Sequence, residues 1–102
     1  MLIRPKDKEN LIQIFSEANI PFEVWAYGSR VNGTAHSGSD LDLVIREKDG
    51  NQIHSELFSF LYNKIKDSNI PILIELRDWT KIPDSFKINI QNKHEVLYSN
   101  ID

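Results

Sequence analysis

Residues 22–45 read FEVWAYGSRVNGTAHSGSDLDLVI and hold two apolar runs separated by a stretch rich in glycine and small hydroxyl residues. The first run, 22–27, is aromatic and β-branched, which favours a strand, and Gly28 ends it. The second run, 41–46, also predicts a strand, and Asp40 and Asp42 share one of its faces because side chains alternate. The segment therefore predicts two strands joined by a turn, a short helix and a loop.

Helical patterns lie on both sides of this segment. Residues 6–18 and 52–67 carry apolar side chains three and four residues apart, as amphipathic helices do. A third strand is predicted at 72–78, a short helix at 83–92 and a possible edge strand at 95–98. The buried stripe predicted for the 52–67 helix consists of Ile53, Leu57, Phe60, Leu61 and Ile65.

The order of these elements predicts the topology. A strand, a helix and another strand form a right-handed crossover unit, so the second and third strands are expected to be parallel. The predicted fold is a mixed α-β (α+β) arrangement, with a small mixed β-sheet flanked by helices in the order α-β-(short α)-β-α-β-α. A length of 102 residues predicts one domain over 1–102.

Composition narrows the functional class. A net charge of −3 disfavours nonspecific coating of DNA or RNA, so no direct nucleic-acid binding is expected. The absence of cysteine excludes disulfides and thiolate metal sites. No apolar run reaches the ~20 residues of a membrane span, and the first residues do not resemble a signal peptide. We expect a cytoplasmic protein.

The paired carboxylates suggest metal chemistry. Asp40 and Asp42 lie about 6.6–6.8 Å apart along a strand, and their short side chains can lean together over a cation. Two-metal phosphoryl transfer uses cations roughly 3.5–4 Å apart. Glu75, on the third strand and opposite its apolar set, is the candidate third ligand. Oxygen-only ligands predict two Mg²⁺ ions, or Mn²⁺.

The Gly-Ser turn suggests a phosphate site. Gly28 allows a close backbone approach, and Ser29 would stand at a helix N-terminus, where N–H groups and the helix dipole favour an anion. Arg30 and loop residues such as Ser39 are candidates for contacting a triphosphate. A common turn and a solvated strand face explain each motif alone. Aspartate is disfavoured in strands, however, and the joint pattern favours nucleotidyl transfer.

The remaining distinctive residues favour structural roles. The three histidines lie far apart without metal-ligand spacing and are predicted at the surface. Trp25, Tyr27 and Trp79 are predicted in the core or an interface, with stacking on a base as the alternative.

Residues 26–33 and 39–43 resemble the signature of minimal nucleotidyltransferase (MNT) domains, which belong to the DNA polymerase β-like nucleotidyltransferase superfamily. Residues 74–79 look like the strand that carries the third carboxylate in that family. The family more often has Asp at the position of Glu75, so the acceptor geometry would shift here. Asp78 is the fallback candidate, although strand alternation turns it to the opposite face.

The resemblance implies roles for these residues. Gly28 and Ser29 would hold the β- and γ-phosphates of the nucleotide, and Asp40 and Asp42 would ligate both Mg²⁺ ions. Glu75 would help to ligate one ion and assist deprotonation of the acceptor.

The resemblance also implies a partner. Larger members of the superfamily grip the acceptor with an extra domain, for which a single domain of this size has no room. Small MNT proteins are typically antitoxins that transfer AMP from ATP onto a tyrosine of a HEPN-domain ribonuclease toxin, so a homo- or hetero-oligomer is expected. Two alternatives stay open: a non-catalytic module that neutralises its partner by forming a complex, and a small-molecule nucleotidyltransferase that needs a dimer mate.

Overall fold

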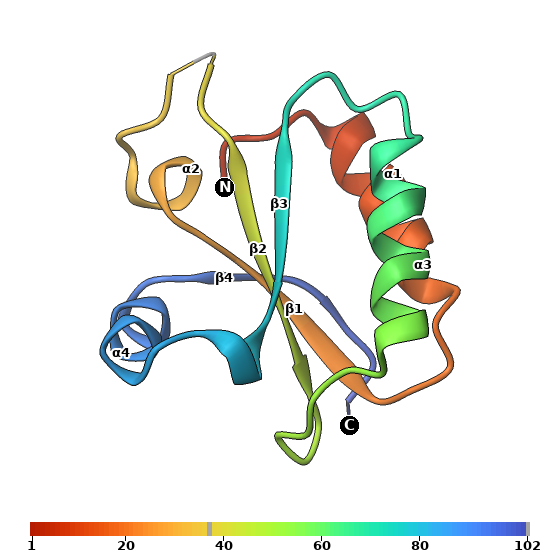
Figure 1. The fold of residues 1–102 in the computed structure, drawn as a ribbon. Helices are drawn as coiled ribbons and strands as arrows, with labels where there is room; N and C mark the ends of the chain where they lie inside the picture. Colours follow the sequence, from red (N-terminus) through yellow and green to blue (C-terminus); the bar gives the residue numbers. More distant parts are fainter. Residues whose placement is uncertain (37, 102) are drawn as a thin grey trace.

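A computed structural model describes residues 1–36 and 38–101 and contains one four-stranded sheet in the order β3-β2-β1-β4 (Figure 1). The strands are β1 (Phe22–Tyr27), β2 (Leu41–Glu47), β3 (Ile74–Asp78) and β4 (Glu95–Ser99). β1 pairs antiparallel with β2 and β4, whereas β2 and β3 are parallel. The mixed sheet and the parallel crossover pair predicted from the sequence are therefore confirmed, and 95–99 forms the edge strand beside β1.

Helices cover both faces of this sheet, as Figure 1 shows. The two longer ones, α1 (Pro5–Ser16) and α3 (Ser55–Lys66), lie together on one side. The short α2 (Ser29–Asn32) follows β1, and the 3-10 turn η1 (Trp79–Lys81) leads from β3 into α4 (Asp84–Asn92) on the other side. Within residues 1–36 and 38–101, no helix has the length and apolar character needed to cross a membrane.

The start of α3 differs slightly from the prediction. Residues 52–54 precede the helix, because His54 has an extended backbone (φ −55°, ψ 135°) and acts as the N-cap. Its ring nitrogen Nδ1 accepts a hydrogen bond from the backbone N–H of Glu56 at 3.3 Å. Such a cap satisfies a donor that the first helical turn leaves free.

The main core lies between the sheet and the pair α1 and α3. Leu41, Leu43 and Ile45 are fully buried in it, which confirms their predicted shared face. Phe60, in contrast, was predicted in the buried stripe of α3 but is 41% exposed. Successive helical residues are turned by about 100°, so the residue before the buried Leu61 faces away from the sheet.

A second apolar cluster covers the opposite face of the sheet. It joins Trp25, Tyr27 and Val44 to residues of η1, α4 and the segment between them, and Val44 is completely buried. The guanidinium of Arg46 lies 4.0 Å from the centroid of the Trp25 ring and 4.6 Å from that of Trp79. The predicted core role of the aromatic residues is confirmed, and the face that carries the candidate carboxylates is partly covered by α4.

Truncation of Leu43 to alanine is expected to lower the free energy of unfolding by about 2–5 kcal/mol, because it leaves a cavity where β2 meets the main core. Urea unfolding followed by circular dichroism measures the loss. Leu73→Ala is the matched control, since Leu73 is 65% exposed, and its effect should stay within about 0.5 kcal/mol. Equal losses in the two variants would contradict the assigned core.

Candidate active site

The turn after β1 brings Gly28 against a candidate metal ligand. Gly28 has φ +81° and ψ −157°, a conformation that is essentially restricted to glycine. A Cβ atom on this residue would lie 2.5 Å from the Oδ2 atom of Asp42. The missing side chain therefore makes room for the Asp42 carboxylate, which reaches the turn because Asp42 is paired with Tyr27 across β1 and β2.

Ser29 begins α2, as the sequence predicts. The turn is closed by the carbonyl of Gly28, which accepts hydrogen bonds from the backbone N–H groups of Val31 and Asn32, both at 3.0 Å. α2 ends after four residues at Gly33, whose φ is +87°. The segment between the strands is thus a tight turn with one helical turn, placed directly beside Asp42.

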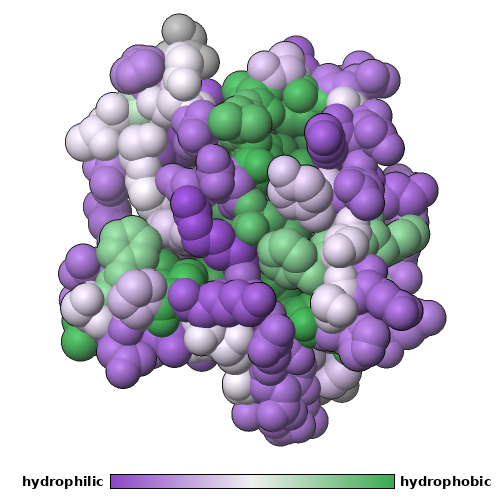
Figure 2. All heavy atoms as spheres, viewed as in Figure 1, coloured by the Kyte–Doolittle hydropathy of each residue, from purple (hydrophilic) through white to green (hydrophobic). Residues whose placement is uncertain are grey.

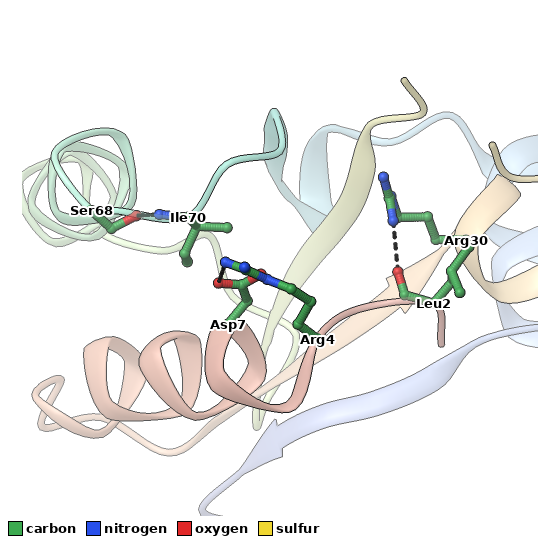
Figure 3. Close-up of polar contacts among 6 residues, drawn as sticks. All are labelled: Leu2, Arg4, Asp7, Arg30, Ser68 and Ile70. Atoms are coloured by element: carbon green, nitrogen blue, oxygen red, sulfur yellow. Dashed lines mark hydrogen bonds and ion pairs between the residues drawn. The ribbon is translucent and has the colours of Figure 1, made fainter. Parts of the chain in front are cut away.

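Arg30 is turned away from this turn and ties neighbouring segments together. Its guanidinium is buried, with Nη1 donating to the carbonyl of Leu2 at 2.8 Å (Figure 3) and Nε donating to the carbonyl of Ser39 at 2.9 Å. The Ser39 hydroxyl accepts a hydrogen bond from the backbone of His36 at 3.0 Å. This placement differs from the prediction that Arg30 and Ser39 face a triphosphate. Both side chains instead form hydrogen bonds with nearby backbone groups.

Asp42 and Glu75 are direct neighbours across the parallel strands β2 and β3. Between their carboxylates lies the guanidinium of Arg77, with Nη1 3.4 Å from Asp42 Oδ1 and Nη2 3.4 Å from Glu75 Oε2. Arg77 Nη1 also donates to the hydroxyl of Tyr27 at 3.1 Å. The topology therefore brings together two of the three predicted carboxylates, and a cationic side chain of the same chain stands between them.

Burial and the neighbouring charges shift the pKa values of Asp42 and Tyr27 in the site. Burial raises the pKa of Asp42; Arg77 opposes the shift, while the charges of Asp40 and Glu75 add to it. The pKa of Tyr27 is also raised, mainly by burial. The negative charges of Asp40 and Glu75 therefore act on Asp42, and a cation beside the Asp42 carboxylate would be stabilised.

The carboxylates fit a hard divalent cation by their chemistry, since Mg²⁺ and Mn²⁺ prefer oxygen ligands. Their arrangement is not yet that of a metal centre. Within the described ranges 1–36 and 38–101, no three acidic or histidine side chains are grouped so that they could hold an ion. The charge between Asp42 and Glu75 is supplied instead by Arg77.

A cavity of about 320 Å³ opens beside these residues. One wall is polar and consists of Tyr27, Gly28, Asp42 and Arg77. The other wall comes from η1, α4 and the link between them, and its residues are Lys81, Ile82, Pro83 and Phe86. A smaller hollow of about 170 Å³ continues past Tyr27 and Phe86 along α4.

The second wall was not identified from the sequence. Its residues have no motif spacing, and the only local signal is that Phe86 is an exposed aromatic residue on an amphipathic helix. A cavity with one polar and one apolar wall, of this volume, is typical of a small-molecule site. The arrangement can hold a flat apolar group against α4 while its charged end reaches Gly28 and Asp42.

Another hollow, of about 190 Å³, lies between α3 and β3 and is apolar apart from Tyr62 and Lys66. Figure 2 shows apolar surface in this region, bordered by hydrophilic surface. Because Asp42, the Gly28 turn and Arg77 line the cavity beside α4, we place the chemistry there.

Asp78, the fallback third carboxylate, has a structural role on the opposite face. It is buried, and its Oδ2 atom accepts a hydrogen bond from the backbone of Ile53 at 2.8 Å. Its Oδ1 atom accepts from the backbone and hydroxyl of Thr80 at 2.9 and 2.8 Å. Asp78 therefore fixes η1 and the segment that precedes α3, which leaves Glu75 as the third candidate.

Comparison with known proteins finds a matching family, a similar sequence and a similar solved structure. The family "Polymerase beta, Nucleotidyltransferase" matches residues 9–102. "Probable protein adenylyltransferase MntA" of Haemophilus influenzae (strain ATCC 51907 / DSM 11121 / KW20 / Rd) is 35% identical over 81 residues, which is 74% of this chain. The match spans 65% of that relative, slightly less than two thirds of its length.

A solved structure, described as "Crystal structure of the toxin-antitoxin with AMP-PNP", superposes with a TM-score of 0.67 at 16% identity. The superposition covers 92% of this chain and 74% of the other. At this identity the likeness establishes the fold.

Proposed function

The chain belongs to the polymerase β nucleotidyltransferase family, and from this membership we propose that it transfers AMP from ATP to a hydroxyl group of a partner protein. The observation that carries the proposal is the Asp42 carboxylate, placed against the Gly28 turn and beside Glu75 at the edge of a two-walled cavity. This arrangement puts candidate ligands for phosphate and cation within one site.

The proposed reaction is a single displacement at the α-phosphorus of ATP. The acceptor oxygen forms a bond to the α-phosphorus. The bond between the α-phosphorus and the oxygen that bridges it to the β-phosphate breaks, and pyrophosphate is released. Gly28 and Ser29 would hold the β- and γ-phosphates through N–H and O–H groups, and Glu75 would take the proton of the acceptor hydroxyl. The apolar side of the cavity, formed by Ile82, Pro83 and Phe86, would receive the adenine ring of the nucleotide.

Asp40, Asp42 and Glu75 would hold the divalent cations. Two Mg²⁺ ions, or Mn²⁺, would neutralise the charge of the triphosphate and of the attacking oxygen when bound. The carboxylates of β2 and β3 then serve to fix the ions relative to the Gly28 turn, which requires Asp42 and Glu75 to release Arg77.

For the acceptor we propose a tyrosine of a HEPN-domain ribonuclease toxin, with this chain as the antitoxin in a hetero-oligomer. Two relatives support the proposal: one is named a protein adenylyltransferase, and the other is a toxin-antitoxin structure with AMP-PNP. Modification of the toxin would take place in the cytoplasm, where ATP is supplied.

Labelled ATP tests this function. With Mg²⁺ and the purified partner, label from the α-phosphate is expected on the partner, label from the γ-phosphate is not, and chelation by EDTA is expected to abolish transfer. Replacing the acceptor tyrosine of the partner with phenylalanine serves as the matched control. Transfer of the γ-label would indicate a kinase, and neutralisation of the partner without any label would indicate a non-catalytic antitoxin.

A further inference from the structure

We propose that Arg77 is a positioning residue that holds the Asp42 and Glu75 carboxylates together before a divalent cation binds, and then gives up its place to that cation. The inference rests on the proposed function, because it takes these carboxylates as the cation ligands. It adds a role for a residue outside the expected ligand and phosphate sets.

The contacts of Arg77 define this role. Glu75 and Arg77 lie two residues apart on β3 and therefore share a face, on which Asp42 of β2 is the neighbour of Glu75. The two terminal nitrogens of the guanidinium face different carboxylates, each at 3.4 Å. The bridge spans the two strands at the point where a shared cation would bind.

Tyr27 supplies the fixed point on which the guanidinium rests. The Tyr27 side chain is 4% exposed, and its ring packs edge-on against Phe86 with 6.0 Å between centroids. Its hydroxyl receives a hydrogen bond from Arg77 at 3.1 Å, shorter than either carboxylate contact. The hydrogen bond to the buried Tyr27 side chain therefore holds the Arg77 guanidinium beside both carboxylates.

Arg77 can leave this position without disturbing the core. Its side chain is 46% exposed, and its contacts with the carboxylates are longer than a well-formed charged hydrogen bond. The side chain also lines the cavity beside Gly28. Release therefore requires a change of side-chain rotamer at the surface, and the cavity gives the freed guanidinium access to an anionic ligand.

A guanidinium and a divalent cation cannot share the two carboxylates. Both need the oxygens that face the gap between β2 and β3, and their positive charges repel at such short separation. The cation must therefore compete with Arg77, which lowers its affinity for the chain alone. Removing the guanidinium should strengthen binding of the cation to Asp42 and Glu75.

Titration with Mn²⁺, followed by the loss of its free electron paramagnetic resonance signal, measures this competition in the full chain. We expect Arg77→Gln to bind Mn²⁺ about three- to tenfold more tightly than the unmodified chain, the scale of losing one partly exposed ion-pair partner. Lys48→Gln removes the same charge at the far end of β2 and should change affinity little. The double variant Asp42→Asn, Arg77→Gln should lose the gain.

Arg77→Lys provides a second variant in case the glutamine variant does not fold. The lysine ammonium keeps the charge but lacks the two terminal nitrogens with which arginine contacts two carboxylates. The affinity of the Arg77→Lys variant for Mn²⁺ should therefore lie between those of the unmodified chain and Arg77→Gln. Unchanged or weaker Mn²⁺ binding in both variants would overturn the inference. If the partner is still labelled in that case, the failure concerns Arg77 alone. A gain in affinity without any transfer of label would support the role of Arg77 and contradict the proposed function.

Discussion

Replacing Asp42 with asparagine is expected to slow the proposed transfer of AMP by about a thousandfold or more, because asparagine keeps the shape of the side chain but removes the charge that would hold a cation. Asp42 is the carboxylate with the most contacts in the site: it adjoins the Gly28 turn, the guanidinium of Arg77 and the strand neighbour Glu75. Single-turnover transfer of α-labelled AMP to the partner measures the rate.

The loss should not come from unfolding. Burial raises the pKa of Asp42, so the folded chain binds a proton here more readily than the unfolded chain. The contribution of this group to stability therefore falls as the pH rises from the ordinary pKa of an aspartate through the raised value. At neutral pH, Asp42→Asn should leave the free energy of unfolding unchanged or slightly higher.

Asp49→Asn, in the exposed turn after β2, is the matched control and should keep full activity. A rate for Asp42→Asn within a few fold of the control would remove Asp42 from the mechanism.

In cells, the double variant Asp40→Asn, Asp42→Asn distinguishes a catalytic antitoxin from one that acts only by forming a complex. If it folds and still protects from the partner, the chain neutralises by covering it.

Gly28→Ala should reduce the proposed transfer of AMP by about a hundredfold or more, since the new methyl group would collide with the Asp42 carboxylate. The Cβ atom would lie 2.5 Å from Asp42 Oδ2, closer than such atoms are found in proteins. The backbone conformation also strains any residue other than glycine, at a cost of about 1–3 kcal/mol. Rate and urea stability should therefore both fall.

Gly33→Ala separates strain from the contact with Asp42. Gly33 also has a positive φ, +87°, but among residues 1–36 and 38–101 no atom other than those of its chain neighbours lies within 4 Å of the position that its Cβ would take. This variant should lose about 1 kcal/mol of stability and keep most of its activity per folded molecule. Equal activity of the two variants would show that the space above Gly28 is not needed for transfer.

The sequence predicted the part of the site that depends on strand alternation and on which strands are neighbours. Alternation places Asp42 on the face opposite the buried Leu41 and Leu43, and a parallel crossover brings the third strand beside β2. These two rules place Glu75 on the strand beside that of Asp42, and the observed register makes the two residues direct neighbours. The turn at Gly28 follows from the break between two apolar runs.

The parts that escaped prediction depend on contacts between distant segments. The wall formed by Ile82 to Phe86 meets Gly28 only after α4 packs on the sheet, and no spacing along the chain encodes that distance. Arg30 was assigned to phosphate by its charge, but the carbonyls of Leu2 and Ser39 hold it in the interior. Strand alternation places Arg77 on the face of Glu75, but its bridge between Asp42 and Glu75 depends on contacts across strands that no spacing encodes.

The two tryptophans of the second apolar cluster provide an intrinsic fluorescence probe of one face of the sheet. Both tryptophans of the sequence, Trp25 and Trp79, lie in it with 5.6 Å between their ring centroids, beside the wall of the cavity. Indole fluorescence therefore observes the α4 side of the sheet, whereas α1 and α3 on the other side contribute most of the helical dichroism. Recording the two signals in one denaturation distinguishes concerted melting from early detachment of α4, without an added dye.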